Sequence, residues 1–398
     1  MLSIEATFRT ESRQVVASLM RRGATIEQAE DALQEAFVVA IETWSRDGTP
    51  VRPGAWITTT AKRRLIDRLR REARRSDKEL MSNLAGSLDQ TDDVDDDRLG
   101  LIFTCCHPAL NLDARVGLTL RAVCGLSTSE VARLFVVAEP TMAQRLVRAQ
   151  HKIAVTNIAF AVPTGDDLGP RVSAVLAVVY TVFTAGYNAV TAGDATKVTL
   201  CDEAIRLARL LQLLLPNDTE VLALLALLLL HDARRDARVD DDSLVLFADQ
   251  DRARWNATEL REGGALIDRA ARMGPVGQYW LQAAIAAEHT LPASAAERDW
   301  RRIASLHRLL VEHTRGSPVA RLNHAIAVSF ADGPAAGLAL IDTITELASH
   351  SDFHAARADL LARLDRHGEA ADAYRRAIET TEDERRRRSL QTALDKLS

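Results

Sequence analysis

The sequence predicts an all-α protein, and two observations support this fold class. Aromatic residues make up only 5% of the 398 residues, whereas alanine and leucine are abundant, a composition that favours helices over sheets. From about residue 170 onward, one helical pattern follows another without the apolar–polar alternation of strands. The length suggests two or three domains, and a hydrophobic content of 47% lets each of them bury a core.

Net charge, cysteine content and apolar segments narrow the class of protein. The formal net charge is −5, so any binding to nucleic acid must come from local basic patches. Four cysteines are too few for a disulfide scaffold, and the N-terminus lacks the pattern of a signal peptide. The apolar segment 172–183 is too short to cross a bilayer, and polar residues interrupt 207–230, so both are predicted to be buried helices. We therefore expect a soluble, cytoplasmic protein without membrane association.

Charge and turn-forming residues divide the chain into segments. Residues 60–75 contain eight Lys or Arg and two Asp or Glu, whereas six aspartates crowd residues 89–97. Such an acidic run is usually solvated and flexible. Prolines and glycines between 163 and 170 mark a second break. The expected organisation is a helical module at 1–77, an acidic linker at 78–97, a second helical module at 98–160 and a helical domain at 170–398.

The last domain contains a hint of repetition. Gly333 and Gly368 lie 35 residues apart, each between an apolar helix and a helix of small residues. This spacing is close to the 34-residue period of tetratricopeptide repeats and predicts a TPR-like domain. An ordinary helical bundle is the alternative, because one matching pair falls short of the three repeats normally needed.

The first amphipathic helix is predicted around residues 29–39. An apolar stripe at helical spacing runs from Ala29 to Ala40 and would pack inward. The remaining surface is acidic or polar and includes Asp31, Gln34 and Glu35. These residues form either the solvated face of a core helix or an acidic docking face for a basic partner.

A strongly basic helix is predicted to begin at Trp56. Ile57, Ala61 and Leu65 can pack inward. Arginines spaced 4, 3 and 4 residues apart share one face, namely Arg64, Arg68, Arg71 and Arg75. A row of guanidiniums repels itself unless a polyanion lies along it, and DNA phosphate is the natural candidate. Trp56 and the neighbouring threonines suit unstacked single strands; the alternatives are a solvated basic face and a tryptophan that belongs to the core.

Residues 118–153 show the most specific local pattern, that of a helix-turn-helix. Ser127 and Glu130 match a capping box, and Gly125 can end the helix before them. Pro140 stands at the start of the last helix, where its missing N–H costs nothing. The expected buried stripe of that helix is Met142, Leu146, Ala149 and Ile153. Polar and basic residues outside the stripe fit a recognition helix in the DNA major groove, with a structural hairpin as the alternative. They are Thr141, Gln144, Arg145, Arg148 and Lys152.

The chain resembles bacterial RNA polymerase sigma factors of the extracytoplasmic-function class, which keep only the modules called regions 2 and 4. The resemblance rests on AEDALQEAF (29–37), PGAWITTTAKRRLIDRLRRE (53–72), LIFTCCHPAL (101–110) and GLSTSEVARLF…EPTMAQRLVRAQHKI (125–153). It extends to the subgroup with a long TPR-like C-terminal extension, through segments such as LCDEAIRLARLL (200–211) and SPVARLNHAIAV (317–328).

The resemblance implies roles for the residues above, in a promoter-specificity subunit with no catalytic residues of its own. Asp31, Gln34 and Glu35 would dock on the clamp helices of the RNA polymerase β′ subunit, and the second module would touch the β flap. The basic helix would melt and read the −10 promoter element. Its candidate residues are Trp56, Lys62, Arg63, Arg64, Arg68, Arg71 and Arg75. The recognition helix would enter the −35 major groove through Thr141, Gln144, Arg145, Arg148 and Lys152.

Several positions depart from the family or suggest other chemistry. Thr184–Ala185–Gly186–Tyr187 stands where family members typically have Asn-Glu-Gly-Tyr, and Lys62 replaces a frequent asparagine. Adjacent Cys105 and Cys106 lack metal-ligand spacing, so we expect buried thiols, no metal and no cofactor. Phosphate loops and nucleophile motifs are also missing, so we do not expect an enzyme.

Residues 170–398 are expected to pack on the DNA-binding modules or to contact the polymerase, and so to tune activity. The alternative function is a stand-alone helix-turn-helix transcription regulator whose C-terminal repeats sense a ligand or a protein. Such a regulator would bind DNA without polymerase and would not need the surface around Asp31 and Glu35. A pure protein scaffold is a third class.

Overall fold

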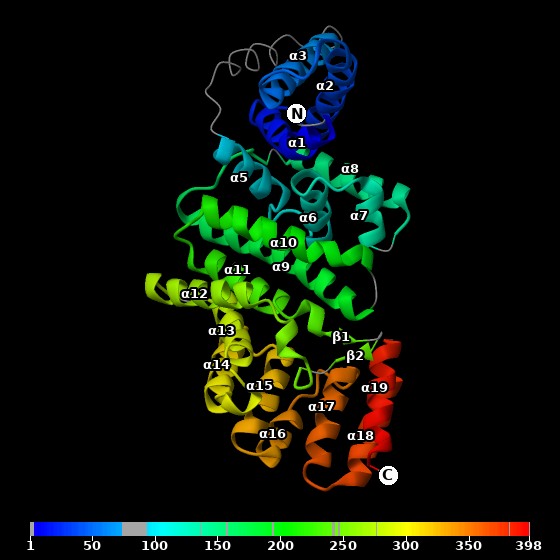
Figure 1. The fold of residues 1–398 in the computed structure, drawn as a ribbon, viewed down its shortest axis with the longest axis vertical. Coiled ribbons are helices and arrows are strands. Elements are labelled where there is room, and N and C mark those ends of the chain that lie inside the picture. The colour runs from blue at the N-terminus through cyan, green and yellow to red at the C-terminus, as the bar shows by residue number, and fades with distance from the viewer. Residues whose placement is uncertain are drawn as a thin grey trace. The chain divides into compact units, whose positions relative to one another are not determined.

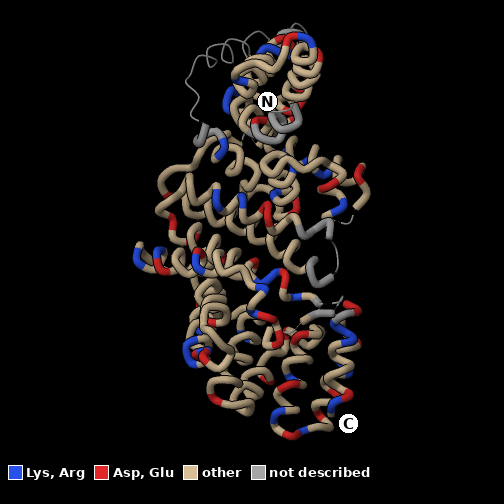
Figure 2. Tube along the Cα trace, viewed as in Figure 1, with Lys and Arg blue, Asp and Glu red and all other residues tan. Residues whose placement is uncertain are grey.

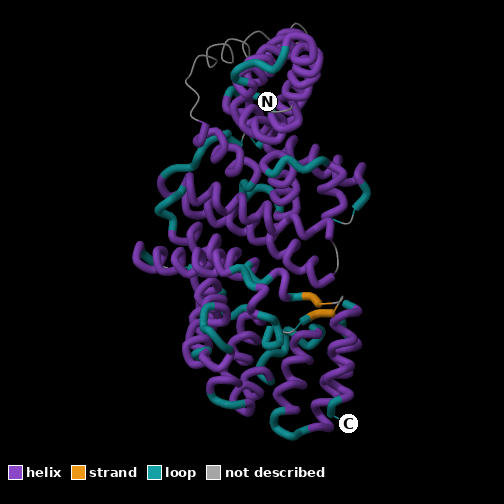
Figure 3. The backbone as a smooth tube through the Cα atoms, in the orientation of Figure 1, coloured by secondary structure: helices purple, strands orange, loops and turns teal. Residues whose placement is uncertain are grey.

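The computed structural model describes residues 4–73, 94–135, 137–156, 158–192, 195–240, 243–245, 247–275, 277–381 and 383–397. These residues are almost entirely helical, which confirms the predicted all-α class (Figure 1, Figure 3). Within the described ranges the strands form one short antiparallel ladder, in which β1 (Val239–Asp240) pairs with β2 (Ser243–Leu244). The chain divides into two compact units, Met1–Thr181 (unit 1) and Val182–Ser398 (unit 2).

Unit 1 begins with a bundle of three helices, α1 (Ile4–Arg21), α2 (Ile26–Asp47) and α3 (Pro53–Ala73). A capping box starts α2, because the Thr25 hydroxyl accepts from the Gln28 N–H while the Gln28 side chain accepts from the Thr25 N–H. The predicted apolar stripe of α2 is buried, as are the inward positions Ile57, Ala61 and Leu65 of α3. Helical periodicity therefore placed both inner faces correctly.

The second half of unit 1 contains α5 (Val94–Cys105), α6 (Leu112–Leu118), the π-helix η2 (Thr119–Val123), α7 (Thr128–Leu134) and α8 (Glu139–Val155). Helix α5 includes the last four residues of the expected acidic linker, 94–97, and residues 78–93 of that linker lie outside the described residues. Aspartates near a helix N-terminus interact favourably with the helix dipole, so part of the acidic run can start a helix. Helix α1 packs against α5 and η2, so the two halves of unit 1 contact each other.

A long apolar helix, α9 (Leu168–Ala192), follows the short 3₁₀ helix η3 (Gly165–Asp167) and crosses the boundary between the units. The stretch Gly165–Asn188 is long and apolar enough to span a membrane by length and composition. Its side chains from Val175 to Phe183 include several that are at most 2% exposed in the folded chain, as the sequence predicted for a buried helix. This burial is typical of a core helix, which passes the same test of length and composition.

Unit 2 continues as a succession of helices in which each packs against the next along the chain (Figure 1). Its α-helices are α10 (Ala195–Leu214), α11 (Thr219–Asp232), α12 (Ala257–Met273), α13 (Gln278–Thr290), α14 (Trp300–His313), α15 (Pro318–Ala331), α16 (Pro334–Ile341), α17 (Ser351–Ala362), α18 (His367–Glu379) and α19 (Glu384–Asp395). The 3₁₀ helices η4 (Arg235–Ala237), η5 (Arg252–Arg254) and η6 (Ala295–Glu297) lie in its loops. Helix α11 is buried all round from Val221 to Leu230, which makes it the central helix of the unit.

The two glycines that suggested a repeat have different structural roles. Gly333 precedes α16 with φ of +100°, a conformation that favours glycine. Gly368 lies inside α18, and the left-handed residue of its turn is Asp365, with φ of +57°. The helix pairs α15–α16 and α17–α18 nevertheless pack as hairpins. The 35-residue spacing therefore marks two similar hairpins but not one shared turn geometry.

The C-terminal helices present both signs of charge (Figure 2). Arg375 pairs with Asp372 at 2.5 Å on α18, and Arg387 pairs with Glu384 on α19. Because these pairs lie three residues apart on exposed helix surfaces, each contributes little to stability.

Candidate functional site

The basic helix α3 places its cationic residues on the outer side of the first bundle. Arg63 is exposed, whereas Lys62, Arg64 and Arg68 are half-buried. Arg71 belongs to α3 but its side chain is outside the described part, and Arg75 lies beyond the described residues. The described portion of this helix therefore offers three arginine side chains that reach solvent.

Arg68 has an acidic partner that the sequence did not indicate. Its guanidinium donates to the carboxylate of Asp31 on α2 at 2.5 Å, with 33% and 39% of the two side chains exposed. A residue predicted to contact DNA and a residue predicted to contact polymerase thus pair with each other. Exposed pairs of this kind contribute about 0–1 kcal/mol to stability. Arg68 and Asp31 can therefore separate at low cost when either residue binds another partner.

The outer face of α2 exposes both polar and apolar side chains. Gln34 is exposed and Glu35 is half-buried, as befits a docking face. Val38 and Ile41, 56% and 53% exposed, extend the same face by helical spacing from Gln34. Sequence reasoning missed these two side chains, although the spacing of 4 and 3 residues contained the signal. Apolar side chains exposed beside polar ones are a common feature of protein-binding surfaces.

One side of the Trp56 side chain packs within the first bundle. Its ring lies 5.4 Å from that of buried Trp44 in an edge-to-face arrangement, and the residue as a whole is half-buried. The hydroxyls of Thr58 and Thr59 donate to carbonyl oxygens one turn earlier, at 2.9 Å each. Only the outer part of the Trp56 indole is free to contact a base. The hydroxyls of Thr58 and Thr59 must break their hydrogen bonds within the helix before they can contact one.

Helices α7 and α8 form as the sequence predicted. The Glu130 N–H donates to the Ser127 hydroxyl at 3.2 Å, and the Ser127 N–H donates to the Glu130 carboxylate at 2.6 Å. These bonds confirm the capping box. The Ser127 hydroxyl also donates to the Glu130 carboxylate at 2.7 Å, and this bond together with the one from the Ser127 N–H lowers the pKa of Glu130 by stabilising the carboxylate. Gly125 adopts φ of +78° before the turn, and Pro140 occupies the first turn of α8.

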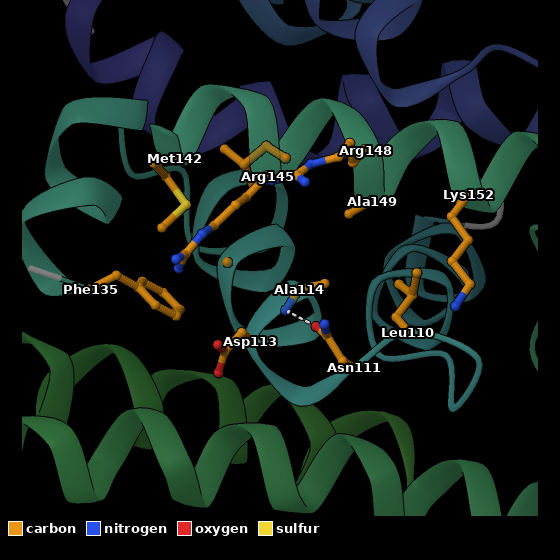
Figure 4. Close-up of a pocket in the computed structure, with 12 residues that line it drawn as sticks. Leu110, Asn111, Asp113, Ala114, Phe135, Met142, Arg145, Arg148, Ala149 and Lys152 are labelled. Carbon is orange, nitrogen blue, oxygen red and sulfur yellow. Dashed lines mark hydrogen bonds between the residues drawn. The ribbon is translucent and has the colours of Figure 1, made fainter. Parts of the chain in front are cut away.

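The predicted binding residues of α8 fall into two groups. Thr141 and Gln144 are exposed at the start of the helix. Arg145, Arg148 and Lys152 line a cavity of about 450 Å³ between α8 and the segment around α6 (Figure 4).

The cavity wall opposite α8 is mixed in charge and polarity. It includes Leu110, Asn111 and Asp113 (Figure 4). Met142 and Leu146 line the cavity from α8. The Lys152 ammonium donates to the carbonyl oxygen of Ala109 at 2.5 Å. Lys152 therefore also ties α8 to the preceding loop, a role that its sequence position did not reveal.

An ion pair joins the two halves of unit 1. Arg121 of η2 lies 3.2 Å from the carboxylate of Glu30 on α2, with 24% and 18% of the side chains exposed. Burial raises the pKa of Glu30, and the attraction of Arg121 opposes that rise without cancelling it. The contact joins α2 to η2.

The cysteines are buried thiols. Cys105, Cys106, Cys124 and Cys201 are all free and buried. Burial raises the pKa of Cys106 to about 11, so the thiol is protonated and unreactive at neutral pH. Among the residues that the structure describes, no group of three or more His, Cys, Asp or Glu side chains is placed to hold a metal ion.

A comparison with known protein families finds a match for the first bundle. Residues 7–75, which include most of α1 and all of α2 and α3, match the model of sigma-70 region 2. The first bundle therefore matches a sigma-70 module, which supports a sigma-70 family member. Members of this family are transcription factors that act with RNA polymerase, so the match points to a sigma-factor role in transcription initiation. Region 2 implies binding to the polymerase core and contact with promoter DNA.

The remainder of the chain has relatives of unknown function. Residues 171–271 match a family of unknown function (DUF6596). The chain is 39% identical over 376 residues to an uncharacterised protein of Rhizobium meliloti (strain 1021), a match that covers 92% of this chain and 89% of the relative. No solved structure matches the chain. The similarity to this relative therefore extends over unit 2 as well as the first bundle.

Proposed function

We propose that this sigma-70 family protein recognises promoters through two separate elements, as a two-module sigma factor of the extracytoplasmic-function class. Helix α3 reads the unstacked −10 element, and α8 enters the major groove at the −35 element. The observation that carries the proposal is the coincidence of the region 2 match at residues 7–75 with the basic helix α3.

The −10 assignment is supported by charge and exposure together. Arg63 is exposed on α3 and Arg64 is half-buried beside it, while Trp56 keeps one side of its ring outside the bundle. Cations can neutralise strand phosphates, and an aromatic edge can stack on an unpaired base. The same proposal includes Lys62, Arg68, Arg71 and Arg75. Binding to unstacked bases favours the open promoter over the duplex.

The −35 assignment is supported by the start of α8. Thr141 and Gln144 are exposed in its first turns, where a recognition helix reaches base edges. Arg145, Arg148 and Lys152 follow on the same helix and can take phosphates or guanine. We propose that the segment from α5 to α8 is sigma region 4 and that it also touches the β flap.

The polymerase-binding surface in this proposal is the outer face of α2. Asp31, Gln34 and Glu35 supply polar contacts to the β′ clamp helices, and exposed Val38 and Ile41 supply apolar area. Unit 2 is proposed to be a TPR-like domain that modulates activity in the cytoplasm by contacting unit 1 or the polymerase.

Run-off transcription with core polymerase tests both DNA assignments. Arg148→Gln removes an exposed charge of α8 and is expected to reduce transcripts by about tenfold on a promoter that needs its −35 element. Arg133→Gln, which removes an exposed charge from α7 instead, is the matched control and should leave transcription within twofold. Equal activity of the two variants would refute the role of α8.

The polymerase assignment has its own test. Glu35→Lys should weaken binding to core polymerase without altering binding to promoter DNA alone, whereas Glu35→Asp keeps the charge and should bind normally. A protein that activates transcription equally well with Glu35→Lys would instead fit a stand-alone regulator.

A further inference from the structure

Four arginines of unit 2, which we call the arginine cluster, have no carboxylate partner among the residues that the structure describes: Arg234, Arg238, Arg252 and Arg298. They come from the segment after α11, from η5 and from the segment after η6. Contacts between η4 and η5, and contacts of Arg234 and Arg298 with the ring of Phe247, bring these segments together. Within the described chain, no Asp or Glu lies within ion-pair distance of any of the four. Their neighbour Arg235 shows the contrast, because it pairs with Asp202 at 2.8 Å and Asp232 at 2.6 Å.

Aromatic rings and neutral oxygens surround the cluster in place of carboxylates. Arg238 is 9% exposed, lies 3.4 Å from the centroid of the Tyr187 ring and donates to the Tyr187 carbonyl. Arg234 donates to the Tyr187 hydroxyl at 2.5 Å and to the Gln250 side chain at 3.2 Å. Arg252 donates to the carbonyl oxygens of Thr290 and Pro292. These contacts fix the guanidiniums in place but do not neutralise them.

Two of these guanidiniums share one aromatic ring and keep unused donors. The Cζ atom of Arg234 lies 4.5 Å from the centroid of the Phe247 ring, and that of Arg298 lies 4.7 Å from the same centroid. Arg298 makes no side-chain hydrogen bond to any described residue. The Nε–H groups of Arg234 and Arg298 are both buried and unpaired. A buried donor without a partner is costly, and a bound group that accepts from it is one explanation.

The neighbouring histidines do not offset the positive charge of the arginine cluster. Burial, together with repulsion from Arg234 and Arg238, lowers the pKa of His231 to about 3. Burial and Arg298 lower the pKa of His289 to about 4. Burial and mutual repulsion also lower the pKa of Arg298, but a guanidinium stays protonated at neutral pH. The region thus holds fixed positive charge in a low-dielectric setting, which requires a counter-charge.

We propose that Arg234 and Arg298, supported by Arg238 and Arg252, bind a phosphate-bearing small molecule beside the ring of Phe247. Guanidiniums match the geometry of phosphate oxygens through paired N–H donors, and several of them together favour a dianion over a monoanion. The aromatic rings hold the arginines in position before the ligand arrives, which lowers the cost of binding. Residues that bind this ligand belong to unit 2, so the proposal does not depend on promoter recognition.

Binding can be measured on the full-length protein by calorimetry and thermal unfolding. The probes are inorganic phosphate and ribose 5-phosphate, with sodium chloride at equal ionic strength as the reference. The expected result is saturable binding and a rise in Tm beyond that given by sodium chloride. Tighter binding of ribose 5-phosphate would identify a phosphate ester as the ligand class, and tighter binding of phosphate would identify the free ion.

Arg298→Gln should bind the preferred probe at least about tenfold more weakly, the effect of losing one charge-assisted contact. Without phosphate it should unfold no earlier than the wild type, because it removes a like charge from the cluster. Arg302→Gln is the matched control: Arg302 lies on α14 nearby, is 64% exposed and pairs with Glu288 at 2.7 Å. It should bind the probe normally.

If Arg298→Gln does not fold, Arg298→Lys keeps the charge and removes the forked donor, and it should also weaken binding. The proposal is overturned if neither probe raises Tm beyond sodium chloride, or if a folded Arg298 variant binds as tightly as the wild type.

Discussion

Truncating one side chain of α8 tests whether this helix depends on its packing against α6. Leu146 is 6% exposed, and its side chain faces Gly117, where an added Cβ would lie 3.5 Å from Leu146 Cδ2. Leu146→Ala removes three buried carbons, and at about 0.8 kcal/mol per buried carbon the loss is about 2.4 kcal/mol. The cavity beside it opens to solvent and lets water enter, so we expect a value at the low end of the range of about 2–5 kcal/mol for such truncations.

Val147 provides a matched control one residue later. It is 55% exposed, so Val147→Ala should cost less than about 0.5 kcal/mol. Amide hydrogen exchange of α8 reports its local stability directly. A loss of about 2.4 kcal/mol corresponds to roughly 50-fold faster exchange, because each 1.4 kcal/mol is a factor of ten. If Leu146→Ala and Val147→Ala exchange at equal rates, α8 does not depend on this packing and the assignment of its inner face fails.

Three further predictions follow from individual contacts. Ser127→Ala removes the N-cap of α7 and should cost about 1 kcal/mol in urea unfolding, whereas Ser127→Thr should cost less than half of that; equal losses would argue against the cap. Burial raises the pKa of Glu259 to about 7, so its contribution to stability should be fullest below about pH 4.5 and fall as the pH rises to 7. In Glu259→Gln the free energy of unfolding should fall by about 1 kcal/mol less over this pH range, a value reduced for the partial exposure of the side chain. An unchanged pH profile would contradict the burial argument. A double-mutant cycle of Arg68→Gln and Asp31→Asn should give a coupling of at most about 1 kcal/mol in thermal unfolding, and a coupling of several kcal/mol would mean that the pair is structural.

Local sequence patterns predicted the helices and their inner faces well. The stripe from Ala29 to Ala40 and the buried positions Met142, Leu146 and Ala149 follow from helical periodicity alone. The capping box of Ser127 and Glu130 depends on residues three apart, so it too could be read from the chain. Ile153 was placed in the same stripe and is half-buried, because it lies in the last turn of α8.

Contacts between distant segments could not be predicted in this way. Arg68 and Asp31 are 37 residues apart, and nothing local indicates that they pair. The same holds for Glu30 and Arg121, which join the two halves of unit 1.

The arginine cluster was also missed. Its members are scattered between residues 234 and 298, among many other arginines of ordinary sequence context. Only the fold brings them around the rings of Tyr187 and Phe247. The Gly186–Tyr187 pair was noted as part of a family motif. In the structure Gly186 lets α10 approach, because an added Cβ would lie 2.9 Å from the backbone nitrogen of Cys201.

The central claim is that the protein directs RNA polymerase to promoters through two DNA-binding helices of unit 1. Abortive initiation with purified core polymerase, on linear templates that carry a promoter selected by the holoenzyme, measures this directly. Initiation should require the protein, fall by about tenfold when either promoter element is scrambled, and be lost when both are scrambled. A folded protein that neither binds core polymerase nor supports initiation from any template would contradict the claim.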